Sequence, residues 1–373
     1  MAGMREIRAA VFTDASGPTT IETLELADPQ AGEILVRMLA SGVCHSDLHV
    51  RDGDWVRPGP VVMGHEGAGI IEAAGTGVDP ALVGRMAALS WYAPCLRCRE
   101  CQRGRQWLCA GSPSLGHRQA DGTTRLRRPD GTPVLAYLSI GTMGSAQVVP
   151  ASAVVPMPEG VPAEIAALIG CGVATGVGAV IKTAAVPPGS TVAVIGLGGV
   201  GLSCVMGAIL AGASRIIAVD VNPAKTDLAV ELGATHRVHP DPADPAGTVD
   251  AIRAAAGHGG PDFAFEAIGL PSTVSQAIAA VAPGGTACLV GLSRIGESAA
   301  LEIVPFVDGG RRVIGSNYGS AVAAVDFPRY ADAYLAGHLP IERLIDRRLP
   351  LDDLEDAFDR LRAGQAVRQI VTF

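Results

Sequence analysis

Four cysteines lie within fifteen residues in the segment CLRCRECQRGRQWLC, which runs from position 95 to position 109. The spacing C-x2-C-x2-C-x7-C suits tetrahedral Zn²⁺, and four thiolates fill every coordination position of a closed structural site. We interpret the arginines between the cysteines as offsetting the negative charge of such a site, not as binding phosphate. Because no position is left for substrate, catalysis must lie elsewhere. The predicted ligands of this structural zinc are Cys95, Cys98, Cys101 and Cys109.

Three further candidate zinc ligands are spread along the chain: Cys44 in GVCHSDLH, His65 in GHEGAG and Cys171 in GCGVATG. Taken singly, such residues are more often core or surface residues than ligands. Together they form the Cys, His, Cys set of a catalytic zinc, whose fourth position stays open for water or an alcohol oxygen. Glu66, which we also assign to this metal site, and Asp47 supply acidic groups that orient the imidazole or tune the metal.

A phosphate-binding loop is indicated by TVAVIGLGGVG, which begins at position 191. A β-branched run precedes the G-x-G-x-x-G pattern and a small-residue helix pattern follows, which is the context of dinucleotide binding. Asp220 ends the next predicted strand about 20 residues on, where a carboxylate binds the adenosine ribose and repels a 2′-phosphate. NAD is therefore predicted over NADP, although Asp220 could be an ordinary strand-end residue, with Asn222 and Lys225 adapting. The predicted coenzyme residues here are Gly196, Gly198, Gly199, Val200, Gly201, Asp220 and Lys225.

The elements that must position these residues fall into two groups. Between 175 and 317, strand-like runs such as FAFEAIG and TACLVGL alternate with helical segments such as PAKTDLAVELGA, which predicts a doubly wound parallel sheet. Residues 1–174 show short strands broken by Gly and Pro, which predicts an antiparallel, barrel-like domain, and residues 318–373 return to it. The uncharged segment 191–213 is long enough for a membrane span, but its glycines predict a buried strand, turn and helix.

Composition excludes several classes of protein. The chain has 373 residues, 48% hydrophobic and 18% charged, which describes a globular protein large enough for two domains and neither a disordered nor a disulfide-stapled one. Its 29 Lys and Arg against 37 Asp and Glu give a net charge of −8, which disfavours nucleic acid as a partner. The N-terminus lacks a secretory signal pattern, so we expect a cytoplasmic protein with thiols instead of disulfides, and no membrane association.

The quoted motifs occur in the order found in one family, and over essentially its whole length the sequence resembles the zinc-dependent medium-chain alcohol dehydrogenases. The resemblance implies an α/β fold with a GroES-like β-barrel catalytic domain, a Rossmann coenzyme domain and an active site in the cleft between them. It also implies one catalytic zinc, held by Cys44, His65 and Cys171, and one structural zinc per subunit. The loop DGTTRLRRPDGTPVLAYL and the ending VRQIVTF are similar to those of the dimeric animal-type branch, so a homodimer is expected.

The resemblance further implies how protons, coenzyme and substrate are handled. Ser46 would take the alcohol proton and pass it, through the nicotinamide ribose hydroxyl, to His49. His45 and Arg368 would contact the coenzyme pyrophosphate, although many relatives carry Arg in place of His45, and Thr175 would contact the nicotinamide side. The residues expected to line the channel for a small-molecule alcohol or aldehyde substrate are Trp55, Trp91, Tyr137 and Leu138. The tryptophans could stack on an aromatic or prenyl alcohol, or could fill space and admit only small alcohols.

Two alternatives stay open. The CH-D-LH and cysteine motifs are also similar to those of mycothiol-dependent formaldehyde dehydrogenases, which would oxidise a thiol adduct of formaldehyde. Arg125, Arg127 and Arg128 could then bind the polar thiol, or could simply be solvated. The second alternative is a non-catalytic, NAD-binding regulatory protein on the same scaffold, because fold alone does not establish function.

Overall fold

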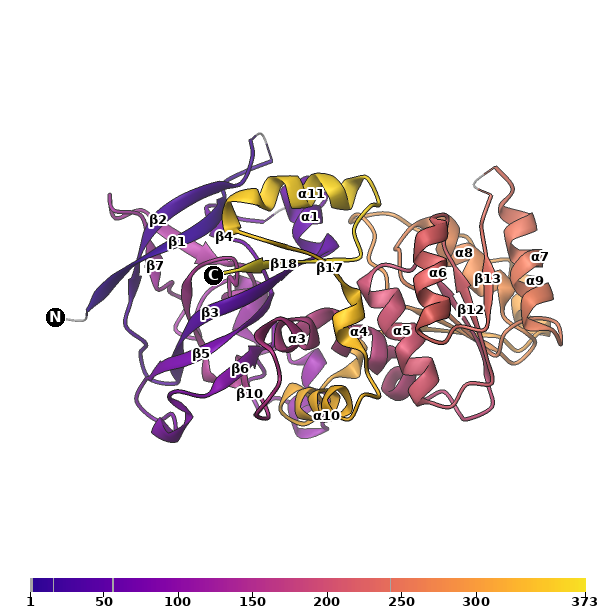
Figure 1. The fold of residues 1–373 in the computed structure, drawn as a ribbon, viewed down its shortest axis with the longest axis horizontal. Helices are drawn as coiled ribbons and strands as arrows, with labels where there is room; N and C mark the ends of the chain where they lie inside the picture. The colour runs from indigo at the N-terminus through magenta and orange to yellow at the C-terminus, as the bar shows by residue number, and fades with distance from the viewer. Residues whose placement is uncertain (1–2, 16, 56, 242) are drawn as a thin grey trace. The chain divides into compact units, whose positions relative to one another are not determined.

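The computed structural model describes residues 3–15, 17–55, 57–241 and 243–373. The chain divides into two units (Figure 1). Unit 1 comprises Met1–Cys171 and Val322–Phe373, and unit 2 comprises Gly172–Ala321. Unit 1 is built from mostly antiparallel strands in a barrel and a second sheet, with β4–β8 and β17–β18 as parallel pairs. Unit 2 is built from a parallel sheet flanked by helices. The predicted α/β fold class, with a GroES-like barrel and a Rossmann-type sheet, is confirmed.

The barrel of unit 1 closes in the order β1-β2-β7-β8-β4. In β1 (Met4–Phe12) the alternate residues Ile7, Ala9 and Val11 are buried in the barrel core, as the two-residue period of a strand requires. The sequence pattern predicted antiparallel pairing, but β4 and β8 run parallel, because β8 returns after a long excursion and not through a hairpin. The other barrel strands are β2 (Thr20–Ala27), β4 (Val61–Val62), β7 (Leu126–Arg127) and β8 (Pro133–Ala136).

The second sheet of unit 1 has the order β10-β6-β5-β3-β18-β17, with β9 also paired to β3. Its central strand β3 (Glu33–Val43) pairs antiparallel with β18, so that Gln369 lies opposite Val43. The C-terminal segment thereby rejoins the first part of the chain. The other strands of this sheet are β5 (Glu66–Ala74), β6 (Met86–Leu89), β9 (Ala146–Pro150), β10 (Val154–Pro156), β17 (Ile345–Leu349) and β18 (Arg368–Thr372).

Two helices of unit 1 pack together, and one of them, α1, carries the catalytic candidates Ser46 and His49. Helix α1 (His45–Arg51) begins directly after β3, and α11 (Leu354–Arg362) lies beside it (Figure 1). The buried residues Leu354, Phe358 and Leu361 give α11 an apolar stripe at helical spacing, which packs in the same core cluster as Leu48 of α1. The other α-helices of unit 1 are α2 (Arg99–Gln102), α3 (Ala163–Leu168) and α10 (Ala323–Leu335).

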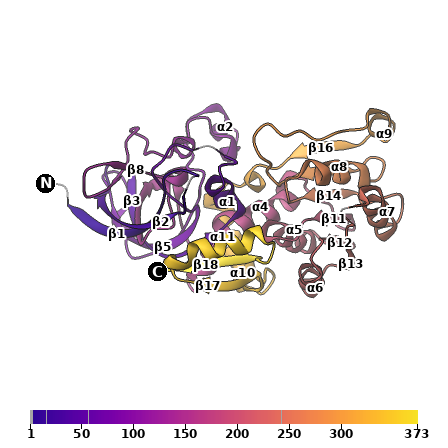
Figure 2. The ribbon, with the colours of Figure 1, turned by 90° about the horizontal axis from the view of Figure 1, so that it is seen from above.

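Unit 2 contains six parallel strands in the order β13-β12-β11-β14-β15-β16. Helices cover both sides of this sheet, with α8 on one side and α6 on the other (Figure 2). The strands are β11 (Thr191–Ile195), β12 (Arg215–Val219), β13 (His236–Val238), β14 (Phe263–Glu266), β15 (Thr286–Leu289) and β16 (Arg312–Gly315). The α-helices are α4 (Ala174–Gly178), α5 (Gly199–Leu210), α6 (Pro223–Glu231), α7 (Pro245–Ala256), α8 (Pro271–Ala280) and α9 (Ile303–Asp308).

One helical stretch, Ala163–Thr183, is long and apolar enough to cross a membrane by length and composition. Inside the protein, however, 83% of its most apolar window is buried, as in the core helix of a globular domain. The uncharged segment 191–213 forms β11 and α5, which are the strand, turn and helix that its glycines predict.

Candidate metal and coenzyme sites

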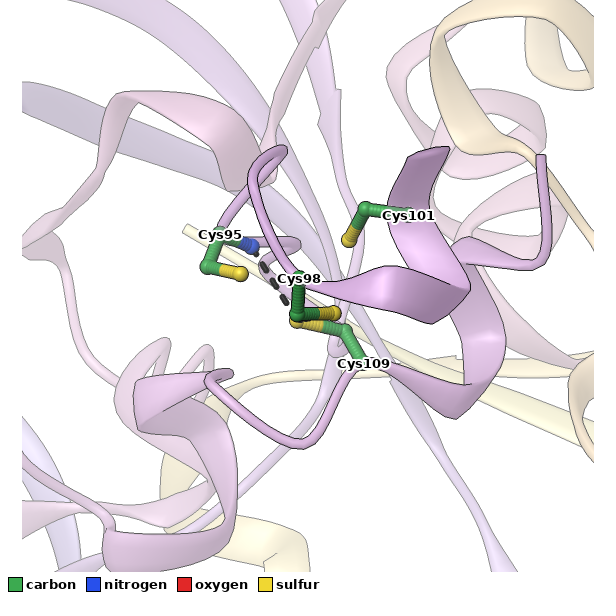
Figure 3. Close-up of side chains that lie close together, drawn as sticks. All are labelled: Cys95, Cys98, Cys101 and Cys109. Carbon is green, nitrogen blue, oxygen red and sulfur yellow. Dashed lines mark hydrogen bonds between the residues drawn. The ribbon is translucent and has the colours of Figure 1, made fainter. Parts of the chain in front are cut away.

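The four-cysteine segment folds into a lobe in which the sulfurs converge (Figure 3). All four Sγ atoms lie within 4.8 Å of one another. Cys98 precedes the short helix α2, and Cys109 accepts a hydrogen bond from the Cys95 N–H at 3.2 Å. Backbone N–H groups directed at the sulfurs, first from Arg97 and Cys101 respectively, lower the pKa of Cys95 and bring that of Cys98 to about 6. These donors favour the thiolates of Cys95 and Cys98, which are the species that bind Zn²⁺. Burial raises the pKa of Cys109 and brings that of Cys101 to about 12, so these two thiols would lose their protons on binding the metal.

A second cluster gathers Cys44, His65, Glu66 and Cys171 in unit 1. One ligand atom of each residue lies within 4.8 Å of the others, and all four residues are buried. Cys44 is the N-cap of α1, His65 and Glu66 stand at the start of β5, and Cys171 lies in a π-helical stretch, Ile169–Val173. π-helical turns inside longer helices often occur at functional sites, because they redirect one side chain.

Asp47 ties two members of this cluster together. Its Oδ1 lies 3.0 Å from His65 Nδ1, and its Oδ2 accepts a hydrogen bond from the Cys44 N–H at 3.1 Å. Asp47 is fully buried, so both contacts are protected from water. A carboxylate that accepts a hydrogen bond from Nδ1–H leaves Nε2 unprotonated and available to a metal.

The protonation of the cluster is shared among its members. The hydrogen bond with Cys171 lowers the pKa of Cys44 well below its usual value despite burial, with the nearby Arg368 cation adding to the effect. The same hydrogen bond, together with burial, raises the pKa of Cys171. Burial alone would disfavour a charged imidazole, but the Asp47 carboxylate and Cys44 raise the pKa of His65. A metal cation bound here would take the place of the protons that these groups now share.

Glu66 and Arg368 form a buried ion pair at the cluster. Burial raises the pKa of Glu66 to about 7, against the opposing effect of the Arg368 guanidinium. Arg368 Nη1 lies 3.3 Å from Glu66 Oε1, yet neither carboxylate oxygen of Glu66 has a hydrogen-bond partner within the described part of the chain. Gly42 makes room for this side chain, because a Cβ there would stand 2.1 Å from Glu66 Oε2.

Both clusters fit zinc. Four converging thiols match a closed structural site, whereas two thiols, an imidazole and an unsatisfied carboxylate match a site with an exchangeable position. The structure therefore brings together all the residues that we predicted as metal ligands. Arg368, predicted to contact the coenzyme pyrophosphate, is buried beside Glu66, and its coenzyme role stays a prediction.

The predicted relay residues Ser46 and His49 lie on α1, as does His45, the predicted coenzyme contact. His45 is exposed at the first position of the helix, and Ser46 is half-buried at the next. His49 is also half-buried, and its Nδ1 lies 2.9 Å from Asp54 Oδ2. Asp54 was not singled out in the sequence, where only its position five residues after His49 could have pointed to it.

The four predicted channel residues lie in a single apolar cluster. Trp55, Tyr137 and Leu138 are buried in it, and Trp91 packs against it. The Tyr137 ring meets the His65 ring edge-on, with centroids 5.7 Å apart, so this cluster adjoins the metal candidates. His117, which the sequence did not reveal, stacks on Tyr137 and accepts a hydrogen bond from the Leu138 N–H at 3.0 Å. Burial, followed by the Arg57 and Arg118 cations, lowers the pKa of His117 to about 4, consistent with a neutral acceptor.

The glycine loop of unit 2 lies between β11 and α5. Gly196 has φ +90, a left-handed conformation that favours glycine. A Cβ on Gly201 would stand 1.7 Å from the Gly196 carbonyl oxygen, whereas a Cβ on Gly198 would meet nothing within 4 Å. Gly201 is thus required by the protein itself, and Gly198 borders open space at the N-terminus of a twelve-residue helix. This is the arrangement that admits a dinucleotide pyrophosphate, and the site fits NAD.

Asp220 follows β12 directly and reaches the loop. Its Oδ2 accepts a hydrogen bond from the Leu197 N–H and its Oδ1 one from the Asn222 N–H, both at 2.8 Å. The loop also lies at the point where strand order reverses, between β11 and β14, which is where nucleotides bind to doubly wound sheets. Thr175 in α4 and Lys225 in α6 are both half-buried, and no contact of either side chain tests its predicted role.

The three loop arginines all pair with carboxylates. Arg125 is buried and bonds to Glu33 through Nε and Nη2, at 2.8 and 2.7 Å. Arg127 lies 2.6 Å from Glu25, and Arg128 lies 2.7 Å from Glu22. These pairs link β7 and its flanking residues to β2 of the barrel and to β3 of the second sheet. The residues that suggested a thiol cosubstrate therefore have structural partners.

Two family models match the chain. The model described as "Alcohol dehydrogenase GroES-like domain" covers residues 30–159, and the one described as "Zinc-binding dehydrogenase" covers residues 199–335. The first match lies within unit 1, whereas the second covers most of unit 2 and continues into the C-terminal part of unit 1.

Solved structures match over the full length. An "Alcohol dehydrogenase zinc-binding domain protein" from Burkholderia ambifaria is 36% identical, with a TM-score of 0.93 and 100% of both chains covered. Benzyl alcohol dehydrogenase from Acinetobacter calcoaceticus is 31% identical, with a TM-score of 0.91 and 99% of both chains covered. A zinc-binding dehydrogenase from Sinorhizobium meliloti 1021, bound to NADP, is 27% identical, with a TM-score of 0.82, covering 99% of this chain and 100% of that one.

Proposed function

The chain belongs to the family of zinc-dependent medium-chain alcohol dehydrogenases, and we propose that it oxidises an alcohol reversibly to an aldehyde or ketone with hydride transfer to NAD. The observation that carries the proposal is the convergence of Cys44, His65 and Cys171, with Asp47 orienting the imidazole. A non-catalytic role would not need these buried ligands together. Thiol-dependent oxidation of formaldehyde lacks support, because the loop arginines are paired with carboxylates.

The chemistry divides between the bound groups and the chain. Zinc, when bound by Cys44, His65 and Cys171, supplies a Lewis acid that makes an alcohol hydroxyl more acidic. Ser46, on the first turn of α1, accepts the hydroxyl proton at Oγ. His49, whose side chain is 23% exposed, releases a proton to water at the protein surface. The buried aromatic cluster around Trp55 and Tyr137 keeps water away from the reacting carbon.

We propose an aromatic primary alcohol as the substrate class. The channel candidates Trp55, Trp91 and Tyr137 offer aromatic faces and edges, which pair well with a benzyl ring. The relative from Acinetobacter calcoaceticus is a benzyl alcohol dehydrogenase, which supports the same class.

We propose NAD as the coenzyme because Asp220 stands at the loop with a carboxylate that would repel a 2′-phosphate. The Sinorhizobium meliloti relative binds NADP, so family membership alone does not decide the coenzyme, and the proposal depends on this single acid.

The experiment is to assay the purified protein with benzyl alcohol and ethanol, each with NAD and NADP, after metal analysis. We expect two zinc ions per chain and a kcat/KM for benzyl alcohol with NAD that exceeds the other three combinations by about tenfold or more. Activity with one metal confined to the four-cysteine lobe would contradict the proposed catalytic site. A preference for ethanol would contradict only the substrate class.

A further inference from the structure

We infer that Asp54 is a positioning residue that holds His49 with its proton on Nδ1, so that Nε2 is the nitrogen that accepts and releases the substrate proton. The inference rests on the proposed alcohol oxidation. Its starting point is the contact of 2.9 Å between His49 Nδ1 and Asp54 Oδ2. A carboxylate can only accept this hydrogen bond, so the imidazole must donate it.

The backbone explains why two residues five positions apart meet. Helix α1 ends at Arg51, and Gly53 adopts φ +79 while its N–H bonds to the Val50 carbonyl at 3.1 Å. A glycine in this left-handed conformation reverses the chain after a helix. The Trp55 N–H then bonds to the His49 carbonyl at 3.1 Å, which places Asp54 beside the imidazole.

The His49 ring is fixed on a second side by Trp55. The two rings are stacked, with centroids 4.7 Å apart and planes inclined by 24°. Trp55 is buried in the apolar cluster that contains Tyr137 and Leu138, so it is a rigid support. The ring of His49 therefore has one edge bonded to a carboxylate and one face on a tryptophan, and little rotation is left to it.

The opposite nitrogen is free to carry protons. Among residues 3–15, 17–55, 57–241 and 243–373, His49 Nε2 has no hydrogen-bond partner, and 23% of the side chain is exposed. The balance per turnover is one hydroxyl proton, which arrives at Nε2 and leaves to water. NAD, when bound, would accept the carbon-bound hydrogen with its electron pair. During the charged step, the Asp54 carboxylate faces the imidazolium and stabilises it.

The test combines ring nitrogen NMR with kinetics on two variants of Asp54. In ¹⁵N-labelled protein, the neutral ring of His49, identified by its loss in H49Q, should be protonated on Nδ1. D54L, which has no acceptor, should shift the ring to the Nε2–H tautomer, lower kcat for alcohol oxidation by about tenfold or more and increase its solvent deuterium isotope effect. D54N keeps an acceptor oxygen, so it should retain the Nδ1–H tautomer and lose less activity.

The matched control is D52N, which removes a carboxylate from the same turn that pairs with Arg362 and not with His49. It should leave the tautomer and kcat unchanged. In D54L the NADH affinity and the KM for alcohol should stay within about twofold, since a change confined to proton transfer acts on kcat.

Three results would overturn the inference: an Nε2–H tautomer in the wild type, a D54L variant with unchanged tautomer and isotope effect, or full turnover in H49Q. The last result would remove the relay from the proposed function but leave zinc-dependent alcohol oxidation standing. Failure of the proposed function itself would appear earlier, as a wild-type protein that oxidises no alcohol.

Discussion

Cys44, His65 and Cys171 form a candidate metal site only as a group, because each alone would be an ordinary buried residue. Cys44 shares a proton with Cys171, and Asp47 links Cys44 to His65. Arg368 adds a buried positive charge that favours the Cys44 thiolate. The cluster is thus prepared electrostatically for a cation at its centre.

The first prediction concerns Cys44. Because C44S replaces a thiolate ligand by a hydroxyl that is a weaker donor to Zn²⁺, we expect one zinc per chain instead of two and a loss of turnover of about a thousandfold or more. NADH binding, for which the glycine loop and Asp220 lie in unit 2, should stay within about twofold of wild type. Metal analysis, alcohol oxidation and NADH fluorescence titration measure the three quantities.

C204S is the control, because Cys204 is a buried residue of α5 and belongs to neither metal cluster. It should keep both zinc ions. Retained turnover in C44S would remove Cys44 from the catalytic site.

The second prediction concerns coenzyme choice. In D220G the carboxylate beside the glycine loop is gone, so the repulsion of a 2′-phosphate is relieved. The ratio of kcat/KM with NAD to that with NADP should fall by about tenfold or more. D227N, which removes a carboxylate that pairs with Arg237 on the surface of unit 2, should leave the ratio unchanged. An unaltered ratio in D220G would count against Asp220.

For individual residues, the sequence indicated which residue types carry the chemistry but seldom which side chains they contact. The cysteine spacing, the glycine pattern and Asp220 are local signals: the cysteines converge and Asp220 contacts the glycine loop, while its coenzyme role stays a prediction. Asp54 and His117 were missed, because a lone acid and a lone histidine carry no signal until the fold sets them against His49 and Tyr137.

Helix α5 and the loop before it form the element on which coenzyme binding depends. The strand β11 and the helix were expected from the β-branched run and the small residues that follow it, and both are present. Hydrophobic period and glycine position act over a few residues, which is why these elements could be predicted. The parallel pairing of β4 with β8 could not, because strands this short, with two residues in β4, carry no directional signal.

The third prediction separates two glycines of this element. G201A would place a Cβ 1.7 Å from a carbonyl oxygen of the loop, so we expect a loss of unfolding free energy of about 1–3 kcal/mol or more. G198A meets nothing in the protein, so its stability should stay near wild type while its NADH Kd rises by about tenfold or more. Urea denaturation and NADH titration distinguish the two. Equal stability losses in both variants would contradict the distinct roles.

Unit 2 carries an exposed apolar face around helix α9. Helix α9 buries none of its residues, and Ile295, Ile303, Val304 and Val307 are 75%, 72%, 69% and 66% exposed. Beside it in sequence, β16 is an edge strand of the described sheet, so one side of its backbone is left unpaired. An exposed apolar face of this kind indicates a site of interaction with another molecule.

We propose that a second copy of the chain covers this face and forms a homodimer. The segment 292–313 carries three arginines and three acidic residues, so two copies meet there without net repulsion, although each chain has a net charge of −8. Two β16 strands can also pair antiparallel across a twofold axis, which extends the sheet and satisfies both edges.

The fourth prediction tests that proposal. V307D places a carboxylate in the apolar face, so a dimer of wild-type protein should become monomeric at micromolar concentration in sedimentation experiments. V230D, on the exposed surface of α6, should remain dimeric. A monomeric wild-type protein, or a V307D variant that stays dimeric, would contradict this interface.

The sequence by itself determined the fold class, the family, the ligand types and the glycine loop, because these depend on spacing and on hydrophobic period within short stretches. Only the tertiary structure decided which charged side chains pair: Arg368 with Glu66, Asp54 with His49, and Arg125 with Glu33, which is 92 residues away in the sequence. A charged side chain in the sequence has many potential partners. Packing selects one partner, because a buried charge must be paired with an opposite charge or a hydrogen-bonding group that the fold places within a few ångströms.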